Sequence, residues 1–239
     1  MTQARAVAMV PARIGSTRLK MKNLALIDGR PMLSYALRAA IESGAFDRVV
    51  VNADHPLFAE IAREYGAEFY LRPAQLGSST TKSDDVVADF IAAHPAQSVA
   101  WVNPTSPLMP ASEVREVVDH FFADGLDSLI TVENKQVHCD FHGQPVNYDR
   151  AGKFAQTQDL VPVQPFVYSI MMWRTEPFLA EMARCGHAFF CGRFGTFPVS
   201  RETGIIIKTE ADLRLADAMM RARKAETALR YHPLADGRD

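Results

Sequence analysis

Short apolar runs alternate with amphipathic segments along most of the chain. The apolar runs predict buried β-strands, and they lie at residues 6–10, 48–52, 68–71, 99–102 and 128–132. Between them, apolar residues recur at helical spacing, and these segments predict helices at residues 31–43, 56–65, 83–93 and 112–123. Strands that alternate with helices are typical of a mostly parallel sheet covered by helices on both faces.

Turn and capping residues mark the ends of several expected helices. Pro31 stands at the start of the first helix and Gly44 follows its end, as the geometry of helix termini favours. Ser83 and Ser112 each precede a helical pattern, and we expect both to be N-caps because a hydroxyl can accept a hydrogen bond from a free backbone N–H.

The alternation is interrupted at residues 133–165. This stretch is rich in Asn, Gln, His, Asp, Gly and Pro, which predicts an inserted arm or hairpin rather than a linker between domains. The pattern then resumes with an apolar run at 166–173, a helix near 176–184, a strand near 194–199 and a last helix at 210–229. Thr209 and Asp212 predict a capping box for that helix. We therefore expect residues 1–239 to form one three-layer αβα domain with a Rossmann-like sheet.

Composition and charge narrow the class of protein. The chain has 239 residues, 48% of them apolar, and a formal net charge of −2. This net charge gives no global basic field that would attract nucleic acid, and no apolar run is long enough to span a bilayer. We therefore expect neither nucleic acid nor a membrane as a partner. The N-terminus runs directly into the first strand, which leaves no room for a signal peptide. Three cysteines without framework spacing indicate reduced thiols and a cytoplasmic protein.

Positive charge is concentrated in the loop that follows the first strand. Arg13, Arg18, Lys20 and Lys22 lie within residues 10–23, with Gly and hydroxyl residues between them and no acidic residue. Backbone N–H groups, hydroxyls and cationic side chains can converge on phosphates in such a loop. Neither the P-loop pattern nor the dinucleotide-binding pattern of glycines is present, so the loop predicts a different kind of phosphate site.

The sequence of this loop resembles the signature of the sugar-acid cytidylyltransferases. The loop reads Pro11-Ala12-Arg13-x-Gly15-Ser16, then Lys22-Asn23-Leu24, and Gly29-Arg30-Pro31-Met32 follows. Further blocks that resemble this family lie at residues 46–54, 65–76 and 103–108, and the similarity thins after Glu133. The family includes the acylneuraminate and 3-deoxy-manno-octulosonate enzymes, which make CMP-activated 2-keto sugar acids.

The resemblance implies a fold, a reaction and a set of site residues. The fold is the nucleotide-diphospho-sugar transferase type, in which the arm joins two subunits as a homodimer. In the reaction, a hydroxyl of a sialic-acid-like 2-keto-3-deoxy sugar acid attacks the α-phosphate of CTP, and pyrophosphate leaves. The implied catalytic residues are Arg13 and Lys22, and Lys208 is a further catalytic candidate because of its place just before the last helix. The implied nucleotide-binding residues are Ala12, Gly15, Ser16, Asn23, Arg72 and Ser83. The residues that would face the sugar acid are Asn103, Thr105 and Ser106.

The resemblance also implies a Mg²⁺ ion held by two aspartates just before the last helix. Ile206 and Lys208 stand at those two positions, and neither side chain can bind Mg²⁺. Three hypotheses follow. Lys208 acts as a fixed cation in place of the metal; Asp54, Glu202 or Glu210 supplies ligands at a shifted site; or the chain is a divergent homologue that binds nucleotide or sugar acid without the usual transfer. The structural alternative for Lys208 is a side chain that points to solvent.

Structural explanations compete with these roles. Arg72 is also suited to anchor a loop by a salt bridge, and Ser83 to cap a helix. Thr105 and Ser106, between two prolines, would form a rigid turn. For Asp54, closure of a turn after its strand is favoured over contact with a metal or ligand.

Three further groups favour structural roles. Residues 138–142 contain His, Cys and Asp side chains, but an irregular arm without a second cluster makes a metal site the less favoured interpretation. Cys185 and Cys191 are expected to be small core residues rather than a redox pair. Four aromatic residues are expected to form core or subunit contacts: Phe189, Phe190, Phe194 and Phe197. Residues 168–173 stand where the family lines its sugar pocket with an Asn-Gly segment, which leaves the identity of the sugar acid open.

Overall fold

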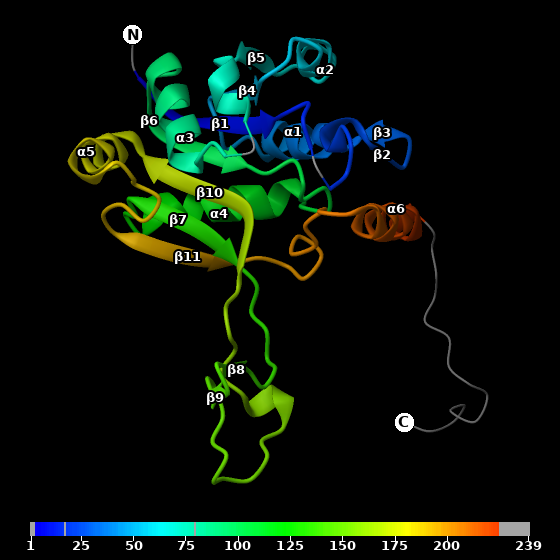
Figure 1. The fold of residues 1–239 in the computed structure, drawn as a ribbon, viewed down its shortest axis with the longest axis vertical. Helices are drawn as coiled ribbons and strands as arrows, with labels where there is room; N and C mark the ends of the chain where they lie inside the picture. Colours follow the sequence, from blue (N-terminus) through cyan, green and yellow to red (C-terminus); the bar gives the residue numbers. More distant parts are fainter. Residues whose placement is uncertain (1–2, 17, 79, 225–239) are drawn as a thin grey trace.

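A seven-stranded sheet forms the centre of the molecule (Figure 1). The computed structural model describes residues 3–16, 18–78 and 80–224. The strands lie in the order β11-β7-β10-β6-β1-β4-β5. Their bounds are β1 Ala4–Ala12, β4 Arg48–Ala53, β5 Glu68–Leu71, β6 Ala96–Val102, β7 Ser128–Val132, β10 Phe166–Arg174 and β11 Phe194–Pro198. Only β10 runs antiparallel to its neighbours, β6 and β7, so the sheet is mostly parallel as predicted.

Helices cover both faces of this sheet. The helices are α1 Met32–Ser43, α2 Phe58–Glu64, α3 Ser83–Ala93, α4 Ala111–Ala123, α5 Thr175–Cys185 and α6 Glu210–Lys224. One core cluster joins α1, α2 and α4 to the sheet, and a second joins α3 and α5 to it. The central strand β1 is buried from Ala6 through Ala12, as expected of a strand covered on both faces. The predicted three-layer architecture is confirmed.

Helix α6 packs apart from these layers. It lies against the small hairpin formed by β2 (Leu26–Ile27) and β3 (Arg30–Pro31), and its Ala216 is buried with Ile27, Leu108 and Ile207. The predicted capping box is confirmed: Asp212 Oδ2 accepts hydrogen bonds from the Thr209 N–H and hydroxyl at 2.8 and 2.9 Å. The predicted end of this helix, at residue 229, lies outside the described residues.

The two serine N-caps were wrongly predicted. Helix α3 begins at Ser83 with Lys82 as its N-cap, and α4 begins at Ala111 with Pro110 as its N-cap. Neither helix has a side-chain hydrogen bond at its cap. Each helix starts earlier than the serine pattern suggested, so the hydroxyls of Ser83 and Ser112 lie inside the first turn. The hydroxyl of Ser83 is thereby left for other contacts.

Residues 133–165 form an arm that projects from the end of the sheet where β7 and β10 meet (Figure 1). Lys135 and Val163 pair at its base in an antiparallel bridge. The short strands β8 (Asp140–Phe141) and β9 (Gln144–Pro145) form a hairpin within it, and a 3-10 turn spans Thr157–Asp159.

None of the helices in the described parts of the chain combines the length and apolar character that crossing a membrane requires.

Candidate functional site

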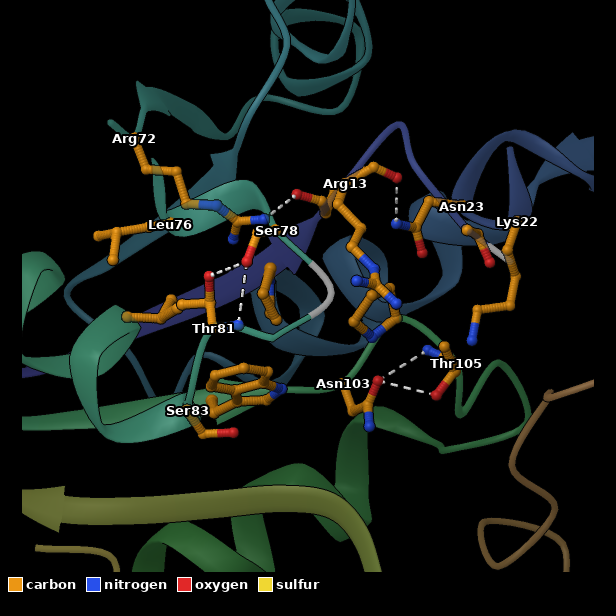
Figure 2. Close-up of a pocket in the computed structure, with 16 residues that line it drawn as sticks. Arg13, Lys22, Asn23, Arg72, Leu76, Ser78, Thr81, Ser83, Asn103 and Thr105 are labelled. Atoms are coloured by element: carbon orange, nitrogen blue, oxygen red, sulfur yellow. Dashed lines mark hydrogen bonds between the residues drawn. The ribbon is translucent and has the colours of Figure 1, made fainter. Parts of the chain in front are cut away.

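A cavity of about 290 Å³ opens at the carboxyl ends of β1, β5 and β6 (Figure 2). Ligands of open parallel sheets bind at this edge, because the loops that follow the strands gather there. The cavity is lined by Pro11, Ala12, Arg13, Ser16, Lys22, Asn23, Arg72, Leu76, Ser78, Thr81, Ser83, Val86, Trp101, Asn103, Pro104 and Thr105. Three of these residues are cationic, and no carboxylate is among the described lining residues.

The loop after β1 forms one wall. The Asn23 side chain is only 5% exposed, and its Nδ2 donates to the backbone oxygen of Arg13 at 3.3 Å. Its Oδ1 is buried without a partner in the described residues. The backbone N–H of Ile14 donates to Asp54 Oδ1 at 2.9 Å, which fastens the loop to the end of β4. Figure 2 shows the side chains of Arg13 and Lys22 reaching toward the loop that carries Asn103 and Thr105.

Lys22 connects this wall to the segment that leads into α6. Its Nζ donates to the backbone oxygen of Ile207 at 3.1 Å. Burial lowers the pKa of Lys22 below its usual value, and the charges of Arg18, Arg13 and Lys208 lower that pKa further. Like charges are thus held together before a ligand is bound, an arrangement that a polyanion would stabilise.

Arg72 forms the opposite wall. It is 6% exposed, and its Nη1 and Nη2 donate to the backbone oxygens of Asn52 and Ala12 at 3.3 and 3.0 Å. These bonds tie together the ends of β4 and β1. Burial lowers the pKa of Arg72, and the charge of Asp54 opposes that shift. Its anchoring partners are therefore backbone carbonyls rather than the salt bridge considered from the sequence.

Polar and apolar groups combine on the side of the cavity formed by α3 and β6. Leu76, Val86 and the indole of Trp101 present apolar surface. The hydroxyl of Ser78 hydrogen-bonds to that of Thr81 at 2.9 Å. The Nε of Arg72 and the Nε1 of Trp101 are buried donors without partners in the described residues. Unpaired buried donors of this kind are costly unless a ligand or water accepts their hydrogens.

The loop after β6 is fixed by its own hydrogen bonds. Asn103 Oδ1 accepts from the N–H and hydroxyl of Thr105 at 3.1 and 2.9 Å, and Asn103 Nδ2 donates to the backbone oxygen of Tyr168 at 3.0 Å. Ser106 is 1% exposed, and its hydroxyl donates to the backbone oxygen of Thr203 at 2.7 Å. Ser106 therefore forms part of a rigid turn, which is the structural role that the sequence suggested for it.

The structure brings most of the predicted site residues together. Those that line the cavity are Ala12, Arg13, Ser16, Lys22, Asn23, Arg72, Ser83, Asn103 and Thr105. Three do not line it: Gly15, Ser106 and Lys208. The prediction that Ser106 faces a ligand differs from the structure because its hydroxyl is directed to Thr203. Lys208 is exposed on the segment that leads into α6.

Trp101 lines the cavity, although the sequence did not predict it as a site residue. It lies on β6 two residues before Asn103, within an apolar run that predicts a buried strand. An indole N–H at the carboxyl end of a central strand is a signal that could have identified it. Leu76, Ser78 and Thr81 were missed because their loop gives no periodic pattern.

The residues present do not fit a Mg²⁺ ion held by carboxylates. Asp54 Oδ1 accepts from the Ile14 N–H, and Gly77 packs so closely that a Cβ there would lie 2.8 Å from the Cβ of Asp54. Glu202 pairs with Arg223. Across residues 3–224, apart from positions 17 and 79, no group of three or more His, Cys, Asp or Glu side chains is placed to hold a metal.

The arm and two cysteines were also considered from the sequence, and the structure shows the contacts or the exposure of each. In the arm, Asp140 accepts hydrogen bonds from the Tyr148 hydroxyl and from Arg150. Cys191 is buried as predicted, and burial raises the pKa of its thiol to about 11. Cys185 is exposed, so its prediction as a core residue was wrong: it is the last residue of α5, on the solvent side.

Comparisons with known proteins give a consistent picture. A family model described as Cytidylyltransferase matches residues 7–160. The N-acylneuraminate cytidylyltransferase of Streptococcus agalactiae serotype V (strain ATCC BAA-611 / 2603 V/R) is 26% identical over 215 residues, which are 86% of this chain and 51% of that protein. That of Escherichia coli O18:K1:H7 (strain RS218 / NMEC) is 34% identical over 113 residues, 47% of this chain and 27% of that protein. The chain thus spans about half the length, or less, of these curated relatives.

Solved structures share the fold. The CMP:2-keto-3-deoxy-manno-octonic acid synthetase complexed with CTP superposes with a TM-score of 0.70 at 18% identity, covering 92% of this chain and 99% of that one. The 4-diphosphocytidyl-2C-methyl-D-erythritol synthase from Anaerococcus prevotii DSM 20548 gives a TM-score of 0.65 at 12% identity, covering 91% and 98%.

Proposed function

The chain belongs to the cytidylyltransferase family, and on this premise we propose that it transfers CMP from CTP to a 2-keto-3-deoxy sugar acid of the sialic acid type, releasing pyrophosphate. The observation that carries the proposal is the cavity itself: Arg13, Lys22 and Arg72 converge in it, and no carboxylate is among its described lining residues. Relatives named N-acylneuraminate cytidylyltransferase support the choice of acceptor class.

The nucleotide would be held between the two cationic walls. Arg13 and Lys22 bind the triphosphate, with Lys22 nearest the reacting α-phosphate, and Ser16 and Asn23 contact phosphate or ribose. The backbone of Ala12 and the loop around Gly15 shape this part of the site. The buried donors of Arg72 and Trp101 and the Ser83 hydroxyl provide hydrogen bonds for the base and ribose.

The reaction needs no protein nucleophile. A hydroxyl oxygen of the sugar acid, held near Asn103 and Thr105, attacks the α-phosphorus of CTP. The bond from that phosphorus to the bridging oxygen breaks, pyrophosphate leaves with the electron pair, and the hydroxyl proton passes to solvent. Catalysis comes from in-line positioning and from cations that stabilise charge developing on the phosphate oxygens. The residues present do not fit a carboxylate-bound metal, so this chain's own cations supply the charge.

We propose further that residues 1–239 form one nucleotidyltransferase domain that acts as a homodimer through its arm. Large apolar side chains are exposed along the arm, among them Phe141 and Phe154, the latter 83% exposed. A cluster of half-exposed aromatic rings lies at its base, formed by Phe166, Tyr168, Phe190 and Phe194. Exposed apolar groups of this size are typical of interaction surfaces, and a second copy would cover both. The three free thiols support a reducing, cytoplasmic setting.

Pyrophosphate release tests the proposal. The protein is incubated with CTP and, separately, with N-acylneuraminate, 3-deoxy-manno-octulosonate and related 2-keto sugar acids, with ATP, GTP and UTP as nucleotide controls. We expect release that requires both CTP and one of the acids. Release from no acid in the panel would contradict the proposed transfer. Calorimetric binding of CTP without turnover would instead support the alternative, a divergent homologue that binds nucleotide without transferring it.

A further inference from the structure

The segment before α6 is fixed across two loops of the cavity. Ile207 is fully buried, its N–H donates to the backbone oxygen of Thr105 at 2.8 Å, and its own oxygen accepts from Lys22 Nζ at 3.1 Å. Thr105 and Lys22 both line the cavity. Lys208 directly follows Ile207, so its backbone is held at the edge of the cavity, on the side of Lys22.

The backbone of Lys208 is fixed from its other side as well. Its N–H donates to Asp212 Oδ2 at 2.9 Å, and the same carboxylate oxygen accepts from Thr209. Asp212 is therefore occupied by the first turn of α6. Within residues 18–78 and 80–224, Lys208 itself forms no ion pair with a carboxylate.

The charges at this edge favour an anion. Burial lowers the pKa of Lys22 most, the charges of Arg18, Arg13 and Lys208 lower that pKa further, and the charge of Asp212 opposes the shift. Unpaired cations held together in this way are stabilised when a polyphosphate binds between them. The exposed side chain of Lys208 has the length and freedom to reach such a ligand.

The charge balance differs from that of a metal site. Two aspartates with one Mg²⁺ carry no net charge, whereas Ile206 and Lys208 together carry one positive charge. Ile206 packs against the apolar core and offers no ligand atom. The positions that the family resemblance assigns to metal ligands are thus converted from a carboxylate pair into an apolar residue and a cation.

We propose that Lys208 binds the polyphosphate of the nucleotide directly, as the fixed cation of a site that does not require a divalent metal for binding. This inference rests on the proposed function, because it assumes that the polyphosphate belongs to CTP. Lys208 is then a binding residue on the segment before α6, and it complements Lys22 on the loop after β1. Nucleotide affinity depends on these cations of the protein more than on Mg²⁺ in solution.

Calorimetric titration of CTP, CDP and CMP tests this inference, with each ligand measured in EDTA and in millimolar Mg²⁺. For the unaltered protein we expect CTP affinities in the two conditions to agree within about threefold, because the fixed cations neutralise the phosphates. Lys208→Ala should weaken CTP binding in EDTA by about tenfold, as loss of a charge-assisted contact does, and CMP binding much less. Lys208→Asp should make CTP binding depend on Mg²⁺.

Arg214→Ala is the matched control, because Arg214 is an exposed cation on α6 that pairs with Glu210. It should bind CTP like the unaltered protein, and thermal melts confirm that each variant is folded. Two results would overturn the inference: CTP binding by the unaltered protein that requires Mg²⁺, or equal affinities for the Lys208→Ala variant and the control. Failure of CTP to bind in either condition would instead contradict the proposed function.

Discussion

The wall and the mouth of the cavity hold their polar groups in different ways. The mouth is the edge formed by Lys22 and Lys208, beside the segment that leads into α6. In the wall, Arg72 and Asn23 are buried and hydrogen-bonded to the backbone of the strands and loops that they join. At the mouth, Lys208 is exposed and Lys22 half-buried, and their main structural link is the backbone of Ile207.

This difference separates stability from recognition. Removal of a wall residue leaves buried carbonyls without donors, so it changes folding and binding together. Removal of Lys22 from the mouth takes its donor from one backbone oxygen, that of Ile207, but it also relieves the repulsion among the neighbouring cations. It should therefore change binding and catalysis much more than folding. The following predictions test that separation.

The largest effect is expected at Lys22. Lys22→Ala should lower kcat by about 10²–10³-fold, as loss of one group that stabilises transition-state charge does, which corresponds to roughly 3–4 kcal/mol. The free energy of unfolding should change by no more than about 1 kcal/mol, because the lost bond to Ile207 is partly offset by relief of the repulsion among the cations. Steady-state kinetics of pyrophosphate release and urea unfolding measure the two quantities.

Arg38→Ala is the control for Lys22, since Arg38 is a half-exposed cation of α1 that pairs with Glu42 and does not line the cavity. It should change neither quantity. A Lys22→Ala variant that unfolds much more easily would show that the mouth also supports the fold, and the separation between the two regions would fail.

Arg72→Ala should have the next largest effect, and on both quantities. The backbone oxygens of Ala12 and Asn52 would lose their donor, and we expect the free energy of unfolding to fall by about 2–3 kcal/mol. CTP affinity should fall as well. Arg72→Lys keeps the charge but cannot make both bonds, so it should retain binding better than stability. Unfolding curves that coincide with those of the unaltered protein would contradict the anchoring role.

Much of the wall could be predicted from the sequence. The bounds of β5 and β7 were predicted to the residue, because short apolar runs between turn residues give clear signals. The cation-rich loop after β1 and its resemblance to a known family pointed to Arg13 and Arg72 in the wall, and also to Lys22 at the mouth, and the structure brings these three residues to one cavity. Local pattern and motif suffice where a site is built at strand ends.

The residues of the mouth were named from the sequence, but their contacts could not be predicted in the same way. The contact between Lys22 and Ile207 joins residues 185 positions apart, and no periodic pattern reports it. Ser83 was predicted as a helix cap because propensity cannot tell a hydroxyl that caps from one that faces a cavity. Ser106 was predicted either to contact a ligand or to form part of a rigid turn, and its hydrogen bond to the backbone oxygen of Thr203 favours the turn. These errors concern side-chain direction, which depends on tertiary packing.

A smaller effect is expected at Asp212, which fixes the position of the mouth. Asp212→Ala removes the capping box of α6 and should lower the free energy of unfolding by about 1 kcal/mol. It also frees the backbone of Lys208 but removes a negative charge close to the cations, so CTP affinity should change little. Chemical denaturation and calorimetry measure these changes, and Glu210→Ala, in the same turn, is the control. Equal stability of the two variants would contradict the capping role.

The smallest effect is the pH dependence of CTP binding through Lys22. The pKa of Lys22 in the free protein lies below its usual value because of burial and the neighbouring cations. A bound polyanion favours the charged form and raises that pKa. CTP affinity is therefore greatest where Lys22 is protonated in both states, and it falls as pH rises through the pKa of the free protein. We expect CTP affinity to decrease as pH rises from neutral toward the ordinary lysine pKa of about 10.4, above the range in which terminal phosphates titrate.

Lys22→Arg separates this titration from other causes, because a guanidinium stays protonated throughout the range. Its CTP affinity should change little with pH, whatever its absolute value. A decline of equal slope in the Lys22→Arg variant would place the titrating group elsewhere. A flat profile in the unaltered protein would mean that Lys22 keeps its proton as an ordinary surface lysine does, so the repulsion among the cations at the mouth would be too weak to bias it toward an anion.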